Sequence, residues 1–381
     1  MIDKSQTVLL ELIKSSLFGI EPQFPEDTDW KAVYEEATAQ TVVALASKAV
    51  PQPAAEEWKE PAAQSTAHYM RALFEQTNLI KLFSANHIPL VIIKGSAAAM
   101  YYPKPQLRMM GDVDFLVPEK DFGSAKALLD ANGYVFQQDY GDDREYSYCK
   151  GGVIFELHRR YSDAEYDVEP ILIRGMENAV THTLHGHSFP TLPDHENGLV
   201  LLDHIRHHLH GGLGIRQIID WMMFANGNLS DEAYRERFLP LIRQAGLVTF
   251  CETVTKMCKL YFGLPDRITW CDQADSDTAT QLLETVMHGG NFGRKDPYVY
   301  KPMKELTSGI RKKGLFRVLQ EAGVANFAIC RRNRFFRCFA WLFQTFRFLG
   351  RGIVALFRGD HLKKDLKDGN EAANFYRKLG L

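Results

Sequence analysis

One short run of residues sets the architecture: Gly111-Asp-Val-Asp-Phe-Leu-Val117. Its apolar residues follow a glycine and predict a strand, along which side chains alternate between two faces. Asp112 and Asp114 are therefore expected on one face, with Val113 and Phe115 in the apolar layer. Two neighbouring carboxylates repel each other, so the pair needs a proton or a cation. Clustered carboxylate oxygens suit Mg²⁺ or Mn²⁺.

A later strand carries a third candidate carboxylate. Tyr146–Cys149 and Val153–His158 are separated by Lys150-Gly-Gly152, which predicts a β-hairpin. Alternation along its second arm puts Glu156 and His158 on one face. If this arm lies beside the first strand, Glu156 joins the two aspartates.

Upstream of the aspartates, the sequence predicts an anion site. Ile88–Ile93 reads as a buried strand, and Lys94, Gly95 and Ser96 follow it at the start of an alanine-rich helix. The free N–H groups of such a turn favour the oxygens of a triphosphate. Gly95 permits close approach of the backbone, Ser96 offers a hydroxyl, and Lys94 or Arg108 neutralises phosphate charge.

This order of features resembles the nucleotidyltransferase superfamily typified by DNA polymerase β. More narrowly, the sequence resembles the bacterial nucleotidyltransferase family 5 from about residue 75 to about residue 230. The residues that carry the narrower resemblance are Lys94-Gly95-Ser96, Arg108, Gly111-Asp112-Val113-Asp114, Glu156-Leu157-His158, His204, His207 and Asp220.

The resemblance implies a metal-dependent transferase that moves a nucleoside monophosphate from a triphosphate such as ATP to a hydroxyl-bearing acceptor and releases pyrophosphate. Asp112, Asp114 and Glu156 would then be the catalytic residues and the ligands of Mg²⁺ or Mn²⁺. Glu156 would also orient or deprotonate the acceptor, which is a small sugar or glycan precursor, a tRNA or a protein. The alternative is a nucleotide-binding or scaffold protein that keeps the fold without turnover.

Later polar residues are candidates for binding the acceptor. The predicted set is His158, His204, His207, Arg216 and Asp220. His158 either faces the acceptor or packs beneath the sheet. The histidines between His204 and His210 recur at helical spacing and either line the substrate cleft or hold zinc. Arg216 and Asp220 are four residues apart on a predicted helix, so they either pair with each other or leave Arg216 free for a phosphate.

Around these motifs we expect an α+β protein with a mixed-sheet nucleotidyltransferase core. The predicted parts are a helical N-terminal region over residues 1–85, the core over residues 86–193 and a helical C-terminal region over residues 194–381. Helical spacing dominates both flanks. Proline residues, among them Pro61, are expected to break up the first of them, and residues 181–193 to close the core.

Composition and charge narrow the class of protein further. The 381 residues include 45 basic and 47 acidic side chains, so the net charge of -2 gives no overall attraction to polyanions. The six cysteines are scattered and the N-terminus lacks the pattern of a secretory signal, which favours the cytoplasm.

One local exception to this charge balance is Arg331–Arg358, where arginines alternate with aromatic residues. Arg347 and Arg351 interrupt its apolar character, so no transmembrane helix is expected. The segment is predicted either to pack as a helix with a solvated basic face or to meet an anionic surface or nucleic acid.

Overall fold

The computed structural model describes residues 2–139, 145–162, 166–209, 212–291, 295, 314–327, 329–330, 333–347 and 371–381. The chain divides into two compact units, Met1–Asp296 and Pro297–Leu381. The first unit contains all the candidate site residues named above. The finer division at residues 85 and 193 stays a prediction.

A mixed sheet lies at the centre of the first unit. Its strands are β1 (Val91–Ile93), β2 (Asp112–Leu116), β3 (Val135–Asp139), β4 (Glu145–Lys150), β5 (Val153–His158), β6 (Val180–Leu184) and β7 (His187–Thr191). They form a seven-stranded sheet in the order β3-β4-β5-β2-β1-β7-β6. β2 is antiparallel to β1 and parallel to β5, while β7 is parallel to β1. The predicted α+β class and the predicted hairpin of β4 and β5 are therefore confirmed.

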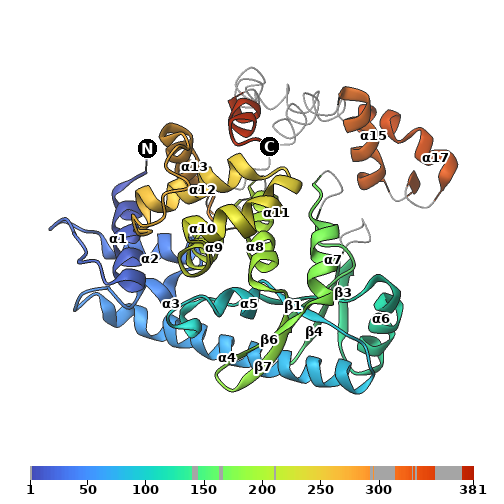
Figure 1. Ribbon diagram of the computed structural model, residues 1–381, viewed down its shortest axis with the longest axis horizontal. Helices are drawn as coiled ribbons and strands as arrows, with labels where there is room; N and C mark the ends of the chain where they lie inside the picture. Colours follow the sequence, from blue (N-terminus) through green and yellow to red (C-terminus); the bar gives the residue numbers. More distant parts are fainter. Residues whose placement is uncertain are drawn as a thin grey trace. The chain divides into compact units, whose positions relative to one another are not determined.

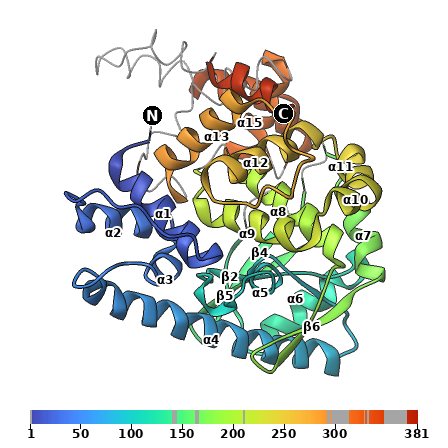
Figure 2. The ribbon, with the colours of Figure 1, turned by 60° about the vertical axis from the view of Figure 1, so that its left-hand side comes forward.

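One face of the sheet is covered by α4 (Ala55–Ala85) and α6 (Phe122–Ala131). Figures 1 and 2 show α4 running along the sheet for most of its length. Phe83 of α4 packs edge-on against Phe115 of β2, with ring centroids 5.6 Å apart. Pro61 does not break this helix as the sequence had predicted, because it lies inside the continuous segment Ala55–Ala85. The apolar face of β2 is thus fully occupied, and its polar face is left for a site.

Helices make up the rest of the first unit. Those before the sheet are α1 (Lys4–Phe18), α2 (Trp30–Ala39) and α3 (Val43–Ala46), and those within it are α5 (Gly95–Ala99) and α7 (Glu169–Glu177). After the sheet come α8 (Asp194–His208), α9 (Ile215–Asn228), α10 (Asp231–Ala233), α11 (Leu239–Gln244), α12 (Val248–Tyr261) and α13 (Ser276–Gly289). In both ribbon views, α8 and α9 lie on the opposite side of the sheet from α4 (Figures 1 and 2). Asn197 of α8 donates to the carbonyl of Ala97 in α5 at 2.8 Å, which ties α8 to the helix that follows β1.

The segment over residues 181–193, which was expected to close the core, contains two strands that the sequence had not predicted. Residues Val180–Leu184 and His187–Thr191 form the hairpin of β6 and β7, which extends the central sheet. His185 and Gly186 connect them with φ values of 48° and 81°. Two consecutive positive φ angles are what a tight two-residue hairpin requires.

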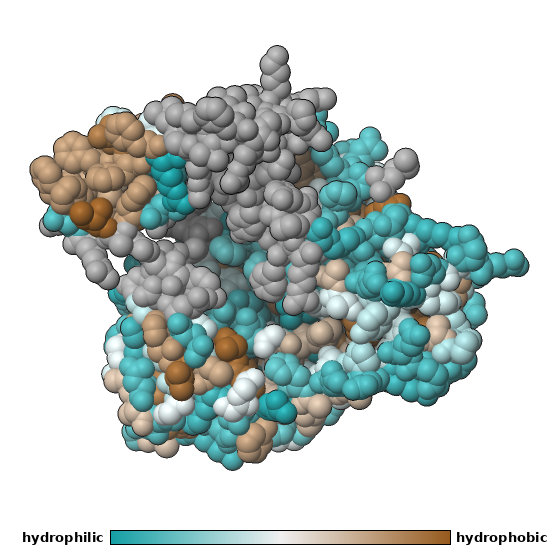
Figure 3. Space-filling model, turned by 180° about the vertical axis from the view of Figure 1, so that it is seen from behind, coloured by the Kyte–Doolittle hydropathy of each residue, from teal (hydrophilic) through white to brown (hydrophobic). Residues whose placement is uncertain are grey.

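The second unit contains α15 (Leu315–Asn326) and α17 (Arg334–Cys338). Its exposed apolar side chains are Leu315, Phe316, Ile329, Phe335, Phe339, Leu342 and Phe346. They give the apolar patch over α15 and α17 in Figure 3. Residues 331–332 and 348–358 of the arginine-aromatic segment lie outside the described residues. Across the described parts of the whole chain, no helix is both long and apolar enough to cross a bilayer.

Candidate active site

Pairing between β2 and β5 brings the acidic residues together. In the parallel register Asp114 is the direct partner of Glu156, and Asp112 is the partner of Ile154. Paired residues on neighbouring strands point to the same side, so Asp112, Asp114 and Glu156 share one face. Val113 lies in the buried core on the other face. The sequence had predicted this alternation, and the neighbouring strands complete it.

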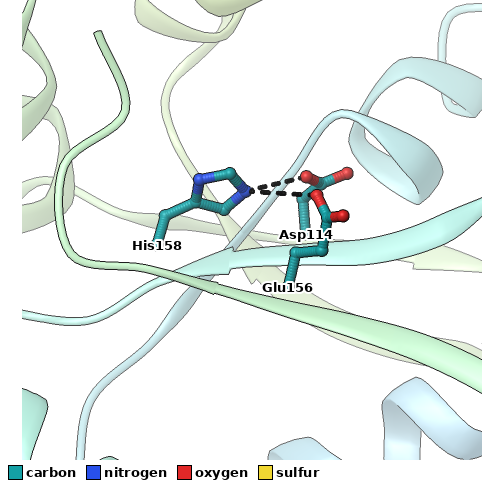
Figure 4. A group of neighbouring side chains, drawn as sticks. All are labelled: Asp114, Glu156 and His158. Atoms are coloured by element: carbon teal, nitrogen blue, oxygen red, sulfur yellow. Dashed lines mark hydrogen bonds and ion pairs between the residues drawn. The ribbon is translucent and has the colours of Figure 1, made fainter. Parts of the chain in front are cut away.

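A compact acidic cluster forms around Asp114, as Figure 4 shows. Nε2 of His158 lies 2.8 Å from Oδ1 of Asp114 and 3.8 Å from Oε2 of Glu156. Within the described residues, Asp114, Glu156 and His158 are the one group of three metal-binding side chains whose ligand atoms all lie within 4.8 Å of one another. Asp112 stands two residues earlier on the same strand face, outside that group.

Lys94 supplies the cation that contacts this cluster. Its Nζ lies 2.5 Å from Oδ1 of Asp114, and the two side chains are only 12% and 1% exposed. Burial alone raises the pKa of Asp114, but Lys94 and the hydrogen bond from His158 outweigh it and hold that pKa well below its usual range. Asp114 is therefore an anion with two donors already on one oxygen.

At the other two carboxylates, the nearby positive charges do not outweigh burial and the neighbouring acids. Burial, together with the charges of Asp114 and Asp112, raises the pKa of Glu156 to about 10. Burial and the charge of Asp114 also raise the pKa of Asp112. Without a further cation the cluster must hold protons. A set of carboxylate oxygens that carries more negative charge than one lysine can balance fits a divalent metal ion.

The backbone turn before the cluster is strained. Lys94 and Gly95 have φ values of 52° and 28°, and a Cβ at position 95 would lie 3.3 Å from Cε of Met110 and 3.4 Å from the carbonyl oxygen of Asp112. A larger residue than glycine would crowd the start of β2. Strained turns of this kind persist where the surrounding structure holds them, and they concentrate at functional sites.

Ser96 is placed differently from the expected phosphate ligand. It is fully buried, and its hydroxyl donates to Oε1 of Gln76 in α4 at 2.6 Å. Gln76 was not among the predicted residues. Its signal in the sequence is a polar side chain in the apolar stripe of α4, between Leu73 and Leu79. The pair fixes the turn against α4.

Arg108 and Asp220 form a buried ion pair across 112 residues of sequence. Nε and Nη2 of Arg108 donate to the two carboxylate oxygens of Asp220 at 2.8 Å and 2.7 Å. The hydroxyl of Tyr102 donates to the same carboxylate at 2.7 Å. Asp220 therefore pairs with Arg108 rather than with Arg216. Arg108 anchors α9 beside β2, and its Nε and Nη2 are already engaged.

Arg216 and the histidines of α8 lie near the acidic cluster. Nη1 of Arg216 donates to the carbonyl of Met109 at 3.0 Å, just before β2. Burial, the neighbouring imidazole of His208 and the charge of Lys94 lower the pKa of His204 well below its usual value. Burial and Lys94 likewise lower the pKa of His208 to about 3. His204 is half-buried and His207 is exposed.

Tyr161 and Glu145 also lie around the cluster, and no local sequence motif had predicted them. Tyr161 lies beside Lys94, whose Nζ is 5.5 Å from its ring centroid, and its hydroxyl donates to the carbonyl of Val200 in α8. Glu145 of β4 approaches the other side of His158, with Oε2 at 3.4 Å from Nδ1. His158 is thus buried between two carboxylates.

A large cavity occupies the other end of β2. It has a volume of about 1290 Å³ and is lined by Phe83, Leu116, Ile173 and Phe189, among other residues of α4, α7 and the hairpin of β6 and β7. Its lining includes none of Asp112, Asp114, Glu156 and His158, so the acidic cluster is not part of this cavity.

A mixed sheet, carboxylates on adjacent parallel strands and a strained glycine turn after a strand are together typical of nucleotidyltransferases. A family described as uncharacterised nucleotidyltransferase matches residues 26–263, and the chain belongs to that family. Among solved structures, the solution structure of the antibiotic-resistance factor ANT(2'')-Ia is similar at 14% sequence identity and a TM-score of 0.33. That match covers 47% of this chain and 97% of the other. No curated protein matches the sequence.

Proposed function

We propose that this protein transfers a nucleoside monophosphate from a nucleoside triphosphate to a hydroxyl-bearing acceptor in a reaction that depends on Mg²⁺ or Mn²⁺. The single observation that carries the proposal is the pairing of Asp114 with Glu156 on adjacent parallel strands, with Asp112 on the same face. Their carboxylates can carry more negative charge than Lys94 alone can offset, so they suit a divalent cation. Such a cation also binds the phosphates of a nucleoside triphosphate.

In this proposal, Asp112, Asp114 and Glu156 hold the metal, with His158 within reach as a further ligand. When bound, such a metal neutralises the triphosphate and increases the electrophilicity of its α-phosphorus. The close approach allowed by Gly95 brings the phosphates beside the start of β2.

The chemical step then requires a base and a charge partner from the chain. The acceptor oxygen bonds to the α-phosphorus, the bond from that phosphorus to the leaving pyrophosphate breaks, and the hydroxyl proton passes to the carboxylate of Glu156. Lys94 is released from Asp114 and neutralises phosphate charge. His204 and His208, which are uncharged at neutral pH, face the acceptor and accept hydrogen bonds from its hydroxyl groups.

The test offers Mg²⁺ and α-labelled triphosphates together with candidate acceptors. We expect transfer of label by the wild type, and loss of that transfer in Asp112→Asn and Asp114→Asn. Glu252→Gln is a suitable control, because Glu252 is a partly buried carboxylate of α12 that accepts a hydrogen bond from the Tyr234 hydroxyl. Tight triphosphate binding without transfer to any acceptor would overturn catalysis and favour a non-catalytic nucleotide-binding protein.

The same assay distinguishes the acceptor classes. Binding to a tRNA would weaken steeply with salt and would depend on arginines of the second unit, such as Arg337 and Arg347. A small sugar acceptor or a protein hydroxyl would be nearly indifferent to substitution of those two residues. We therefore pair each acceptor trial with the double variant Arg337→Gln, Arg347→Gln.

A further inference from the structure

Among the described residues of the first unit, Arg108, Arg206 and Arg216 have guanidinium groups shielded by protein, and two of them have a carboxylate partner. Arg108 is bidentate on Asp220. Arg206 donates to Asp203 at 2.6 Å and packs over the ring of Tyr166. Both follow the rule that a cation removed from water is paired with an anion.

Arg216 is the exception. Its Nη1 donates to the carbonyl of Met109, but its Nε is shielded from solvent and has no hydrogen-bond partner. Among the described residues, no carboxylate lies within ion-pair distance of it. Asp220, one helical turn further along α9, is already occupied by Arg108. The residue as a whole is partly exposed, so a ligand can reach it.

The surroundings of Arg216 indicate where that ligand lies. Its Nη1 is 3.9 Å from the position of a Cβ on Gly111, the residue just before Asp112. The backbone of Asp112 also contacts the Gly95 turn. Burial and the charge of Arg108 lower the pKa of Arg216, while Asp220 and Asp112 oppose that effect. Arg216 is thus a cation in need of an anion, beside the strand start that Gly95 leaves accessible.

We propose that Arg216 is a binding residue for the phosphate chain of the triphosphate, on the nucleotide side of the acidic cluster and not on the acceptor side. This proposal rests on the proposed function only in taking a triphosphate as the ligand. A planar guanidinium that no carboxylate occupies suits the oxygens of a phosphate, which accept two parallel hydrogen bonds. The bound phosphate supplies the partner that Asp220 cannot.

The first test measures binding of inorganic tripolyphosphate with Mg²⁺ by titration calorimetry, without any acceptor or turnover. We expect Arg216→Met to weaken binding about tenfold or more, since a charge-assisted hydrogen bond contributes about 1.5–3 kcal/mol. Arg216→Lys should restore part of the loss. The control is Arg267→Met, because Arg267 also donates to a backbone carbonyl, that of Asn226, but on the surface. Equal affinities in wild type and Arg216→Met would overturn the proposal.

The second test uses the melting temperature of the ligand-free protein. Removing a cation that lacks an anion should leave the melting temperature unchanged or raise it, so Arg216→Met should be at least as stable as the wild type. Arg206→Met should melt lower, because it leaves Asp203 buried without its partner. If the melting temperature fell as much in Arg216→Met as in Arg206→Met, Arg216 would have a structural role and the proposal would be refuted. Neither measurement depends on nucleotide transfer, so failure of this proposal can be distinguished from failure of the proposed function.

Discussion

Asp114 and Glu156 are direct partners across the parallel strands β2 and β5, and Lys94 contacts only the first of them. The raised pKa of Glu156 follows from this asymmetry, since its carboxyl is buried beside two acids. Any cation that enters the cluster must therefore displace a proton as well as share the charge of Asp114.

The first prediction concerns metal affinity and pH. Because Glu156 is protonated at neutral pH in the metal-free protein, Mn²⁺ should bind more tightly as pH rises from 6 to 9, by up to about tenfold per pH unit. Calorimetry in buffers of different ionisation enthalpy should show proton release on binding. Glu156→Gln should bind Mn²⁺ more weakly and with a flatter pH dependence. If the Mn²⁺ affinity of Glu156→Gln depended on pH as steeply as that of the wild type, the proton released on binding would come from another group.

The second prediction is the pH dependence of stability without metal. A carboxyl whose pKa is higher in the folded than in the unfolded protein binds more protons when folded, so the free energy of unfolding falls as pH rises. For Glu156 the window runs from its unperturbed value of 4.5 to about 10. In EDTA, the wild type should lose stability through this range, and Glu156→Gln should lose less. Urea denaturation at several pH values measures the difference, and saturating Mg²⁺ should remove it.

The third prediction is that Lys94 competes with the metal. Its Nζ occupies Oδ1 of Asp114, so a metal ion that binds this oxygen must displace it. In the absence of a triphosphate, Lys94→Met should bind Mn²⁺ about tenfold more tightly, while its affinity for the triphosphate falls. Lys259→Met is the matched control. Lys259 is 14% exposed, against 12% for Lys94, and it contacts Asp272 at 2.8 Å away from the site. Weaker Mn²⁺ binding in Lys94→Met would contradict this competition.

The sequence predicted those parts of the site that depend on local pattern. Alternation along β2 put Asp112 and Asp114 on one face, and the double glycine before Val153 marked the hairpin that carries Glu156. Local patterns did not predict which strands are neighbours in the sheet. β2 pairs with β5 and not with β3, the strand that follows it in sequence, and such pairing depends on long-range packing that a local pattern does not contain.

Two features of the structure have physical causes that local patterns do not contain. The hairpin of β6 and β7 was missed because a histidine occupies the first position of its turn, where asparagine or aspartate would have been the usual signal. Arg216 and Asp220 have the spacing of a helical ion pair, but Arg108 meets both oxygens of Asp220. A bidentate contact from a distant residue thus replaces a one-turn contact.

The last prediction tests this long-range pair. Asp220→Asn removes the carboxylate that forms the ion pair with Arg108, and it weakens the acceptor for the Tyr102 hydroxyl. Breaking one partner of a buried pair leaves an uncompensated charge, so the free energy of unfolding should fall by about 3–5 kcal/mol. The control is Glu56→Gln, which removes an exposed pair with Lys59 and should cost less than about 1 kcal/mol. Urea denaturation of the full chain measures both. If Asp220→Asn were no less stable than Glu56→Gln, the pair would not be what holds α9 against the start of β2, and Arg216 would lose the structural support that positions it beside Gly111.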